Sequence, residues 1–256
     1  MPRSSRMTGL VKLAAAAAIG ATIAGGASAV ATTDNTAHSR QQPANIGQVK
    51  LDVKAYYGGF VDAAGKNQAS DTSQWAKETA KQVADAKQYL ARRLQNHVKN
   101  PAIVLDVDDT SEVTYGWEAD NDFGFDPVKQ QAAIDSGRFP AIKPTLELAN
   151  WASQRGVRVI FLTGRNELQG PQSLKNLANE GYPAPAQAYF KPKTTAPAYL
   201  PCGLTCTTVQ YKSGTRAHIE ATGSTIVLNL GDQFSDLEGG HAERPVKLPN
   251  PMYYLP

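Results

Sequence analysis

Three acidic side chains follow directly on an apolar run near the middle of the chain. Residues 103–110 read IVLDVDDT, which places Asp106, Asp108 and Asp109 at the end of a strand-like segment. Carboxylates this close repel one another unless a cation or hydrogen-bond donors offset their charge. Their oxygens are also the hard ligands that Mg²⁺ prefers in proteins. The run therefore predicts chemistry that depends on a divalent cation.

Three other segments place polar residues where the same cation would lie. Thr163 ends the apolar run VIFLTGR, Lys212 opens a helix in YKSGTRAHIE, and Asp232 follows the run in TIVLNLGDQFSD. In an open parallel sheet, ligands bind beyond the carboxyl ends of the strands, so these residues are expected at one edge. Asp232 would add a metal ligand, while Lys212 and the Thr163 hydroxyl would bind a phosphoryl group. Asp108 would stand beside the leaving group as a general acid.

The elements that must position these residues alternate between strand-like and helical patterns. Strand-like apolar runs cover residues 102–105, 157–162 and 225–230, and helical spacing covers 72–96, 144–154, 168–180 and 213–221. Because the strand-like runs are continuously apolar, we expect them to be buried on both faces. Strands that alternate with helices are typical of a parallel sheet with helices on both sides. The sequence thus predicts a single α/β domain over residues 51–256 that begins with a helix.

About thirty residues, 111–141, interrupt this alternation. They include the aromatic and acidic stretch TYGWEADNDFGFD and an Asp-Pro pair at 126–127, which is typical of a helix N-cap followed by proline. We expect a small helical cap insertion that lies over the end of the first strand. Trp117, Phe123 and Phe125 are open to two interpretations, a wall for an aromatic leaving group or the insertion's own core.

Several polar residues keep two interpretations. Arg165 is open between a substrate contact and a salt bridge that holds the insertion in place. Asp232 and Asp236 could instead cap the helix that starts at FSDL. The acidic residues of the insertion are expected to form a solvated loop, with a calcium site as the alternative; they are Asp120, Asp122 and Asp126.

The N-terminus has the layout of a secretory signal peptide. Basic residues precede an apolar stretch over 13–24, and small-residue cleavage sites follow near Ala29 and Ala31. The apolar stretch is shorter than the ~20 residues needed to cross a bilayer, so cleavage is favoured over anchoring. We expect residues 1–31 to be removed, the protein to be secreted, and residues 32–50 to form a flexible leader.

The charge of the chain gives no argument for a nucleic-acid polymer or a membrane as partner. The sequence has 26 Lys and Arg and 23 Asp and Glu, and the predicted signal peptide contains three of the basic residues. The mature chain is therefore formally neutral. Cys202 and Cys206, in CGLTC, are the only cysteines, and an exported chain is expected to oxidise such a close pair. Two sulfurs with no adjacent histidine are too few for a metal site.

Four ordered motifs carry a family resemblance. DVDDT, TGR, the lysine of YKSGTR and GDQFSD look like the motifs of the haloacid-dehalogenase-like (HAD) superfamily. Within it, the chain resembles the secreted acid phosphatases of the class B type and the plant vegetative-storage-protein-like group. GDQFSDLEGG and the C-terminal KLPNPMYYLP are especially similar to the plant group. The resemblance covers approximately residues 55–256 and implies a Rossmann-like HAD fold with a small helical cap.

The resemblance also implies a role for each matched residue. Asp106 would attack phosphorus and form an aspartyl-phosphate, and Asp108 would protonate the leaving alcohol and then activate water. Mg²⁺ would be bound by Asp106, Asp232 and the main-chain carbonyl of Asp108, and Asp236 would orient water bound to the metal. The phosphoryl group would be held by three residues, Thr163, Gly164 and Lys212.

We therefore expect a secreted, Mg²⁺-dependent acid phosphatase that hydrolyses small phosphate monoesters. Two alternatives stay open: a phosphotransferase to alcohols or nucleosides, and a storage or surface-binding protein that keeps the fold without turnover. Neither the alcohol half of the substrate nor the oligomeric state follows from the sequence. Asp109 is also left without a role.

Overall fold

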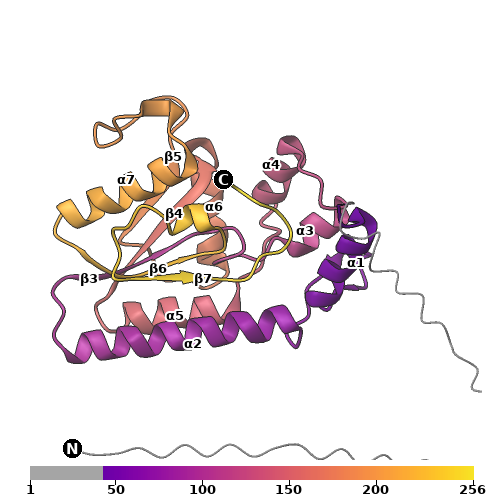
Figure 1. The fold of residues 1–256 in the computed structure, drawn as a ribbon, viewed down its shortest axis with the longest axis horizontal. Helices are drawn as coiled ribbons and strands as arrows, with labels where there is room; N and C mark the ends of the chain where they lie inside the picture. Colours follow the sequence, from indigo (N-terminus) through magenta and orange to yellow (C-terminus); the bar gives the residue numbers. More distant parts are fainter. Residues whose placement is uncertain (1–42) are drawn as a thin grey trace, which may run out of the picture. The chain divides into compact units, whose positions relative to one another are not determined.

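Five strands form one parallel sheet in this computed structural model, which describes residues 43–256 (Figure 1). The order across the sheet is β5 (Gln187–Lys191), β4 (Arg158–Asn166), β3 (Pro101–Leu105), β6 (Thr225–Gly231) and β7 (Arg244–Lys247). Every neighbouring pair is parallel, so the carboxyl ends of the strands lie at the same edge. This confirms the expected α/β fold with a parallel sheet.

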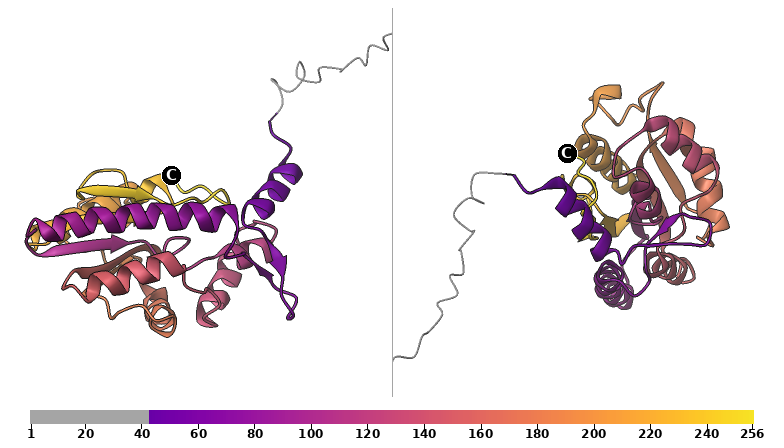
Figure 2. Two further views of the ribbon diagram at one scale, coloured as in Figure 1. Left: turned by 90° about the horizontal axis from the view of Figure 1, so that it is seen from below. Right: turned by 90° about the vertical axis from the view of Figure 1, so that its right-hand side faces the viewer.

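Helices cover both faces of the sheet, and Figure 2 shows two of them, α2 and α5, side by side. The covering helices are α2 (Gln74–Gln95), α5 (Lys143–Ser153), α6 (Gly170–Asn179) and α7 (Thr208–Ala221). On β3, Ile103 and Leu105 join a core with α2 and α5. Ala102 and Val104, which point to the other face, join a core with α7. Burial on both faces explains why this strand is apolar at every position.

Helix α7 begins earlier than the sequence pattern indicates. It starts at Thr208, and Thr207 caps it in a capping box with Gln210. Lys212 therefore lies in the second turn of the helix, and the expectation that it opens the helix is wrong. The start of the helix is marked by these cap residues. The periodicity of apolar residues, on which the expectation was based, does not detect them. The outer strands β5 and β7 are likewise short and are not predicted by the apolar pattern.

The insertion forms two short helices, α3 (Tyr115–Asp120) and α4 (Pro127–Asp135). Asp126 caps α4 with its side chain, and proline occupies the first turn, as predicted. Trp117 is buried with residues of α4, and Phe123 packs near Tyr115. These two aromatic residues are core of this region, whereas Phe125 is 69% exposed.

The acidic residues of the insertion have separate partners. Asp120 accepts hydrogen bonds from Asn67 and pairs with Arg138. Asp122 pairs with Lys50 at 2.6 Å, and the third, Asp126, is the cap of α4. The three carboxylates are therefore not gathered into one calcium site.

The described chain begins with α1 (Ile46–Tyr56) and a two-stranded antiparallel hairpin, β1 (Phe60–Val61) and β2 (Asn67–Gln68). The expected leader over residues 32–50 thus differs from the structure at 46–50, which are helical. Asn45 caps the helix through Gln48 N, and the buried anchor Val53 lies beyond the polar stretch that suggested a leader. The predicted signal peptide, residues 1–31, lies outside the described residues. Within the described part, no helix has the length and apolar character to span a membrane.

Short 3₁₀ helices complete the fold: η2 (Glu167–Gln169), η3 (Gly203–Thr205) and η4 (Phe234–Asp236). Cys202 and Cys206 flank η3 and form a disulfide, with their Cα atoms 5.0 Å apart. This confirms the predicted disulfide, which closes the loop that precedes α7.

Candidate active site

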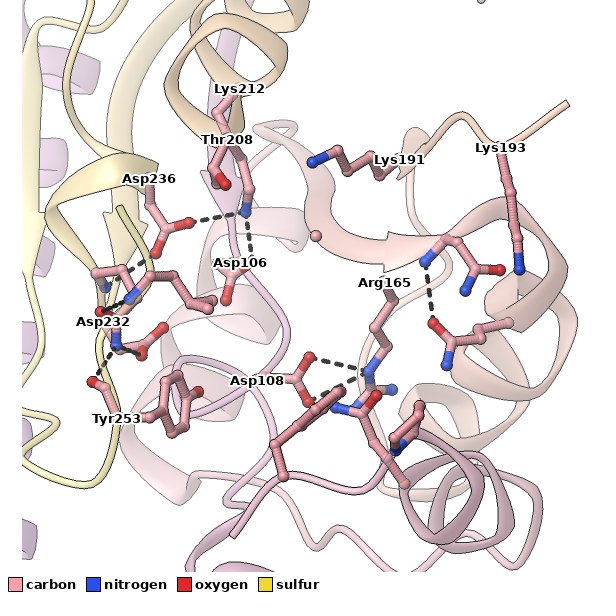
Figure 3. A pocket seen from close by; sticks show the side chains of 18 of the residues that line it. Asp106, Asp108, Arg165, Lys191, Lys193, Thr208, Lys212, Asp232, Asp236 and Tyr253 are labelled. Atoms are coloured by element: carbon pink, nitrogen blue, oxygen red, sulfur yellow. Dashed lines mark hydrogen bonds and ion pairs between the residues drawn. The ribbon is translucent and has the colours of Figure 1, made fainter. Parts of the chain in front are cut away.

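A pocket of about 490 Å³ lies at the carboxyl edge of the sheet (Figure 3). Strand ends from β3, β4 and β6, the start of α7, the insertion and the C-terminal residues all contribute to its wall. Six of the predicted site residues line it: Asp106, Asp108, Gly164, Lys212, Asp232 and Asp236. The placement follows from the topology, since β4 and β6 flank β3 in the sheet.

Asp106 and Lys212 form the centre of the pocket floor. The ammonium of Lys212 donates to Asp106 Oδ1 at 2.5 Å and to the Leu162 carbonyl at 2.6 Å, and it pairs with Asp236 Oδ1 at 2.9 Å. Burial raises the pKa of Asp106 well above its usual range, and Lys212 offsets part of that rise. Burial acts to lower the pKa of Lys212, but the carboxylates of Asp106 and Asp236 outweigh it and raise the pKa. Lys212 is thus a permanent positive charge.

Three buried carboxylates meet beside this lysine. Oxygens of Asp106, Asp232 and Asp236 all lie within 4.8 Å of one another. Burial, followed by repulsion from Asp236 and Asp109, raises the pKa of Asp232 to about 7. One lysine cannot offset three carboxylates, and closely spaced oxygen donors are the ligand set of Mg²⁺ and similar hard cations. The residues therefore fit a divalent cation.

Asp108 lies on the other side of the pocket and faces Arg165. Arg165 donates to both Asp108 oxygens, from Nη2 at 2.6 Å and from Nε at 3.1 and 3.2 Å. Nη2 also donates to Glu112 Oε2 at 2.7 Å. Burial acts to lower the pKa of Arg165, but Asp108 and Glu112 outweigh it and raise the pKa. The structure thus shows Arg165 in the salt bridge that was one of its two interpretations, and Glu112 is its partner from the insertion.

The two predicted phosphate contacts on β4 differ in exposure. Thr163 is fully buried, and its hydroxyl accepts from Arg165 N at 3.1 Å instead of lining the pocket. Gly164 is exposed at the pocket wall, and a Cβ built there would meet no atom within 4 Å. The open surface at Gly164 leaves room for a ligand to approach the main chain.

The comparisons with known proteins point to one family. The family model described as HAD superfamily, subfamily IIIB (Acid phosphatase) matches residues 28–256. The chain belongs to this family. Family membership confirms the resemblance drawn from the four motifs, and the family is one of phosphoric monoester hydrolases.

Individual relatives of this HAD family member include plant proteins. Acid phosphatase 1 of Solanum lycopersicum is 34% identical over 156 residues, 59% of this chain and 58% of that protein. Stem 28 kDa glycoprotein of Glycine max is 30% identical over 185 residues, 70% and 69% of the two chains. Vegetative storage protein 1 of Arabidopsis thaliana is 29% identical over 157 residues, 60% and 55% of the two chains. The match thus spans less than two thirds of the tomato relative's length.

A solved structure shares the fold. The Class C acid phosphatase from Bacillus anthracis superposes with a TM-score of 0.61 and 18% sequence identity, over 82% of this chain and 86% of that one. At this identity the likeness concerns the fold alone, which is the HAD fold expected from the motif order.

In this HAD family member, Asp109 has hydrogen-bond partners outside the pocket floor. Its backbone has φ of 51°, and its carboxylate accepts from Thr114 N at 3.0 Å, Thr114 Oγ1 at 2.5 Å and Tyr253 Oη at 2.8 Å. Burial raises its pKa to about 7. Asp109 therefore joins the start of the insertion to the C-terminal residues, a role that the acidic run alone does not reveal.

Several pocket residues of this family member are not predicted by the sequence. Thr208, the first residue of α7, points into the pocket beside Lys212 (Figure 3). Lys191, at the end of the unpredicted strand β5, and Lys193, just beyond it, also line the pocket. Phe125 of the insertion lines it too, in agreement with the first of its two interpretations, a pocket wall. The Asp-Pro pair that predicts α4 lies just before Gln130 and Gln131, which form part of the pocket wall. No local feature of the sequence predicts the two lysines. These residues form the part of the pocket wall that the four motifs do not supply.

Proposed function

We propose that this protein is a secreted, Mg²⁺-dependent acid phosphatase that hydrolyses small phosphate monoesters through an aspartyl-phosphate on Asp106. One observation carries the proposal. The Asp106 carboxylate lies on the floor of an open pocket, between a charged lysine and two further buried carboxylates. This is the arrangement that a nucleophile for a dianionic phosphate requires, because the repulsion between nucleophile and phosphate must be offset.

In the first step, an oxygen of Asp106 bonds to phosphorus while the bond between phosphorus and the ester oxygen breaks. Asp108 gives its proton to the departing alkoxide. Lys212 keeps its positive charge against the phosphoryl oxygens and holds Asp106 in place through the 2.5 Å hydrogen bond. The Gly164 main chain and the Thr208 hydroxyl line the space for those oxygens.

In the second step, Asp108 takes a proton from water, and the water oxygen bonds to phosphorus. The bond from phosphorus to Asp106 then breaks, which releases inorganic phosphate and restores the carboxylate. Arg165 donates to both Asp108 oxygens, which fixes the orientation of that carboxylate for both proton transfers. Arg165 thus aims Asp108 into the pocket and ties it to the insertion through Glu112.

The proposed metal ligands are Asp106, Asp232 and the main-chain carbonyl of Asp108, with Asp236 beside them. When bound, Mg²⁺ would supply positive charge that offsets the phosphoryl oxygens and the carboxylates. The support is the cluster of three buried carboxylates and its donor chemistry. Secretion is supported by the signal-peptide pattern of residues 1–31 and by the disulfide.

The test is hydrolysis of p-nitrophenyl phosphate by the wild type and by Asp106→Asn, each with Mg²⁺ and with a chelator. We expect chelation to abolish wild-type turnover and the substitution to abolish it at every Mg²⁺ concentration. Equal rates for the two proteins would overturn the assignment of Asp106. A wild-type rate that chelation leaves unchanged would overturn the metal assignment.

A non-catalytic storage protein is the second candidate, because one relative carries the name Vegetative storage protein 1. The intact pair of Asp106 and Asp108 argues against it. Absence of turnover over a broad range of pH and phosphate esters, in a protein that still binds Mg²⁺, would favour this candidate. Product analysis with an added alcohol separates a hydrolase, which yields only inorganic phosphate, from a phosphotransferase.

A further inference from the structure

The C-terminal tail, residues 248–256, contributes directly to the pocket. It follows β7, and Figure 1 shows it looping out from the end of that strand and turning back toward the sheet. Tyr253 and Leu255 line the pocket, and Figure 3 shows the Tyr253 ring between Asp232 and Asp108. The motif KLPNPMYYLP, which has no role in the four-motif chemistry, supplies these residues.

The tail reaches the carboxylate of Asp232 through Asn250. The amide Nδ2 of Asn250 donates to Asp232 Oδ2 at 2.7 Å, and Gln233 Nε2 donates to the same oxygen at 2.8 Å. Thr110 Oγ1 contacts the other oxygen, Oδ1, at 3.3 Å. Two amide donors on one oxygen fix the rotation of the carboxylate, which is how outer hydrogen-bond partners orient metal ligands.

The tail also reaches the acidic turn through Tyr253. Its hydroxyl donates to Asp109 Oδ2 at 2.8 Å, and the same carboxylate accepts from Thr114 at the start of the insertion. Asp109 adjoins Asp108 and lies three residues beyond Asp106, in a turn with a positive φ. A hydrogen bond to Asp109 therefore fixes the turn that aims both of the proposed catalytic aspartates.

Both ends of the tail are anchored. Leu248 is fully buried, and its N–H donates to the Gly231 carbonyl at 2.9 Å. Near the other end, the Leu255 carbonyl accepts from Ser235 Oγ at 2.8 Å and its N–H donates to Gln233 Oε1 at 3.2 Å. The tail is held in place at the points where it meets the site, as a positioning element must be.

We propose that the C-terminal tail is an integral part of the metal site, in which Asn250 positions Asp232 for the cation and Tyr253 positions the turn that carries Asp106 and Asp108. Asn250 and Tyr253 are positioning residues, since they act through other side chains. The inference rests on the proposed function for the identity of the cation. It goes beyond that function because it assigns a task to residues outside the four motifs.

The experiment measures Mg²⁺ binding by isothermal titration calorimetry, without substrate. Asn250→Ala should raise the Mg²⁺ dissociation constant by about tenfold or more, the usual effect of removing an outer partner of a metal ligand. Asn150→Ala is the matched control, because the Asn150 amide donates to the main-chain carbonyls of Leu146 and Gly181 and does not line the pocket. This control should bind Mg²⁺ with wild-type affinity.

Tyr253→Phe keeps the half-buried ring and removes only the hydroxyl. We expect kcat for p-nitrophenyl phosphate to fall by about fivefold to tenfold while KM changes little. The reason is that the lost hydrogen bond affects the orientation of the catalytic aspartates. Tyr254→Phe is the matched control, since Tyr254 is the adjacent tyrosine and is 75% exposed. It should retain wild-type kinetics.

The outcomes separate this inference from the proposed function. Wild-type Mg²⁺ affinity in Asn250→Ala, or wild-type kcat in Tyr253→Phe, would overturn the assigned role of that residue. If Asn250→Ala fails to unfold cooperatively, Asn250→Ser replaces it, and its dissociation constant must also rise. A chain that binds Mg²⁺ in an Asn250-dependent manner but hydrolyses no ester would refute the proposed phosphatase and leave the role of Asn250 standing. A wild type that binds no Mg²⁺ would refute both.

Discussion

Asp106 and Asp108 stand two positions apart in sequence but lie in different surroundings. Asp106 is buried on the pocket floor, where one lysine faces it and two other carboxylates crowd it. Asp108 has a side chain that is 22% exposed and a bidentate arginine partner. The floor sets three carboxylates against one lysine among the described residues, whereas the Asp108 side sets two, Asp108 and Glu112, against one arginine.

This difference supports the separate tasks that we propose for the two aspartates. A buried carboxylate that lacks full compensation is stabilised when a cation enters, and the same cation would offset its repulsion from a phosphoryl group, which suits a nucleophile. A carboxylate at the pocket wall, accessible to water, suits proton transfer to and from small molecules. Arg165 also connects Asp108 to Glu112 of the insertion. Movement of the insertion would therefore change the position of Asp108, and with it proton transfer, more than the positions of the carboxylates on the floor.

The largest effect is expected at Lys212. Among the described residues, Lys212 is the cation that forms ion pairs with both Asp106 and Asp236, so Lys212→Met leaves these carboxylates without their direct partner. We expect kcat to fall by about a thousandfold, and stability without Mg²⁺ to fall by about 3–5 kcal/mol. Added Mg²⁺ should restore part of the stability but not the activity. Urea unfolding with and without Mg²⁺ measures this, and a variant as stable as the wild type would contradict the description of the floor.

Asp108→Asn should have a smaller effect that depends on the substrate. The amide cannot transfer a proton, so we expect a loss of about 10²–10⁴-fold for alkyl phosphates, whose leaving groups need protonation. For p-nitrophenyl phosphate the loss in the first step should be much less, because its leaving group is stable as an anion. A plot of rate against leaving-group pKa checks this. Equal losses for all leaving groups would show that Asp108 does not protonate the alcohol.

Arg165→Lys tests the ion pair on the Asp108 side. Lysine keeps the charge but cannot bind both Asp108 oxygens and Glu112 through a planar fork. We expect kcat to fall by about tenfold while the Mg²⁺ dissociation constant is unchanged, because the floor is untouched. A large change in Mg²⁺ affinity would mean that the two sides of the pocket are coupled. Arg155→Lys, on a residue that does not line the pocket, is the matched control.

The fold and the floor of the site were accessible from the sequence for one physical reason. Strands buried on both faces, such as β3, are apolar throughout, so the polar residue that ends each strand is conspicuous. Topology then brings those ends together, which is how Asp106 and Asp232 could be placed at one site. Lys212 was found by motif context, although the start of its helix was misplaced.

The rest of the site could not be predicted because its signals are not local. Asp109 needs a positive φ and a partner 144 positions away, Tyr253, to have a role. Lys191 enters the pocket from a short, half-buried outer strand that has no apolar pattern. Thr163 carries a family motif, yet its hydroxyl is buried against the Arg165 main chain. Contacts that join distant segments are properties of the packed chain, and periodicity does not encode them.

The smallest expected effect concerns Glu118, a buried carboxylate of α3 on the insertion side of the pocket. Burial, with a smaller contribution from Asp108, raises the pKa of Glu118 from 4.5 to about 7. The folded state therefore binds a proton more tightly than the unfolded chain between these values, so this residue makes stability fall as pH rises from about 4.5 to about 7. Glu118→Gln keeps the shape and removes the charge.

At pH 8, Glu118→Gln should be more stable than the wild type by about 1–2 kcal/mol, after allowance for partial solvent screening. At pH 4 the two proteins should be nearly equal, because the carboxyl is protonated in both the folded and the unfolded chain. Thermal unfolding at the two pH values measures this, with an expected rise in Tm of about 2–8 °C at pH 8 alone. Glu147→Gln, in α5 and away from the pocket lining, is the control. An equal shift at both pH values would mean that packing, and not the charge of Glu118, limits the stability of the insertion.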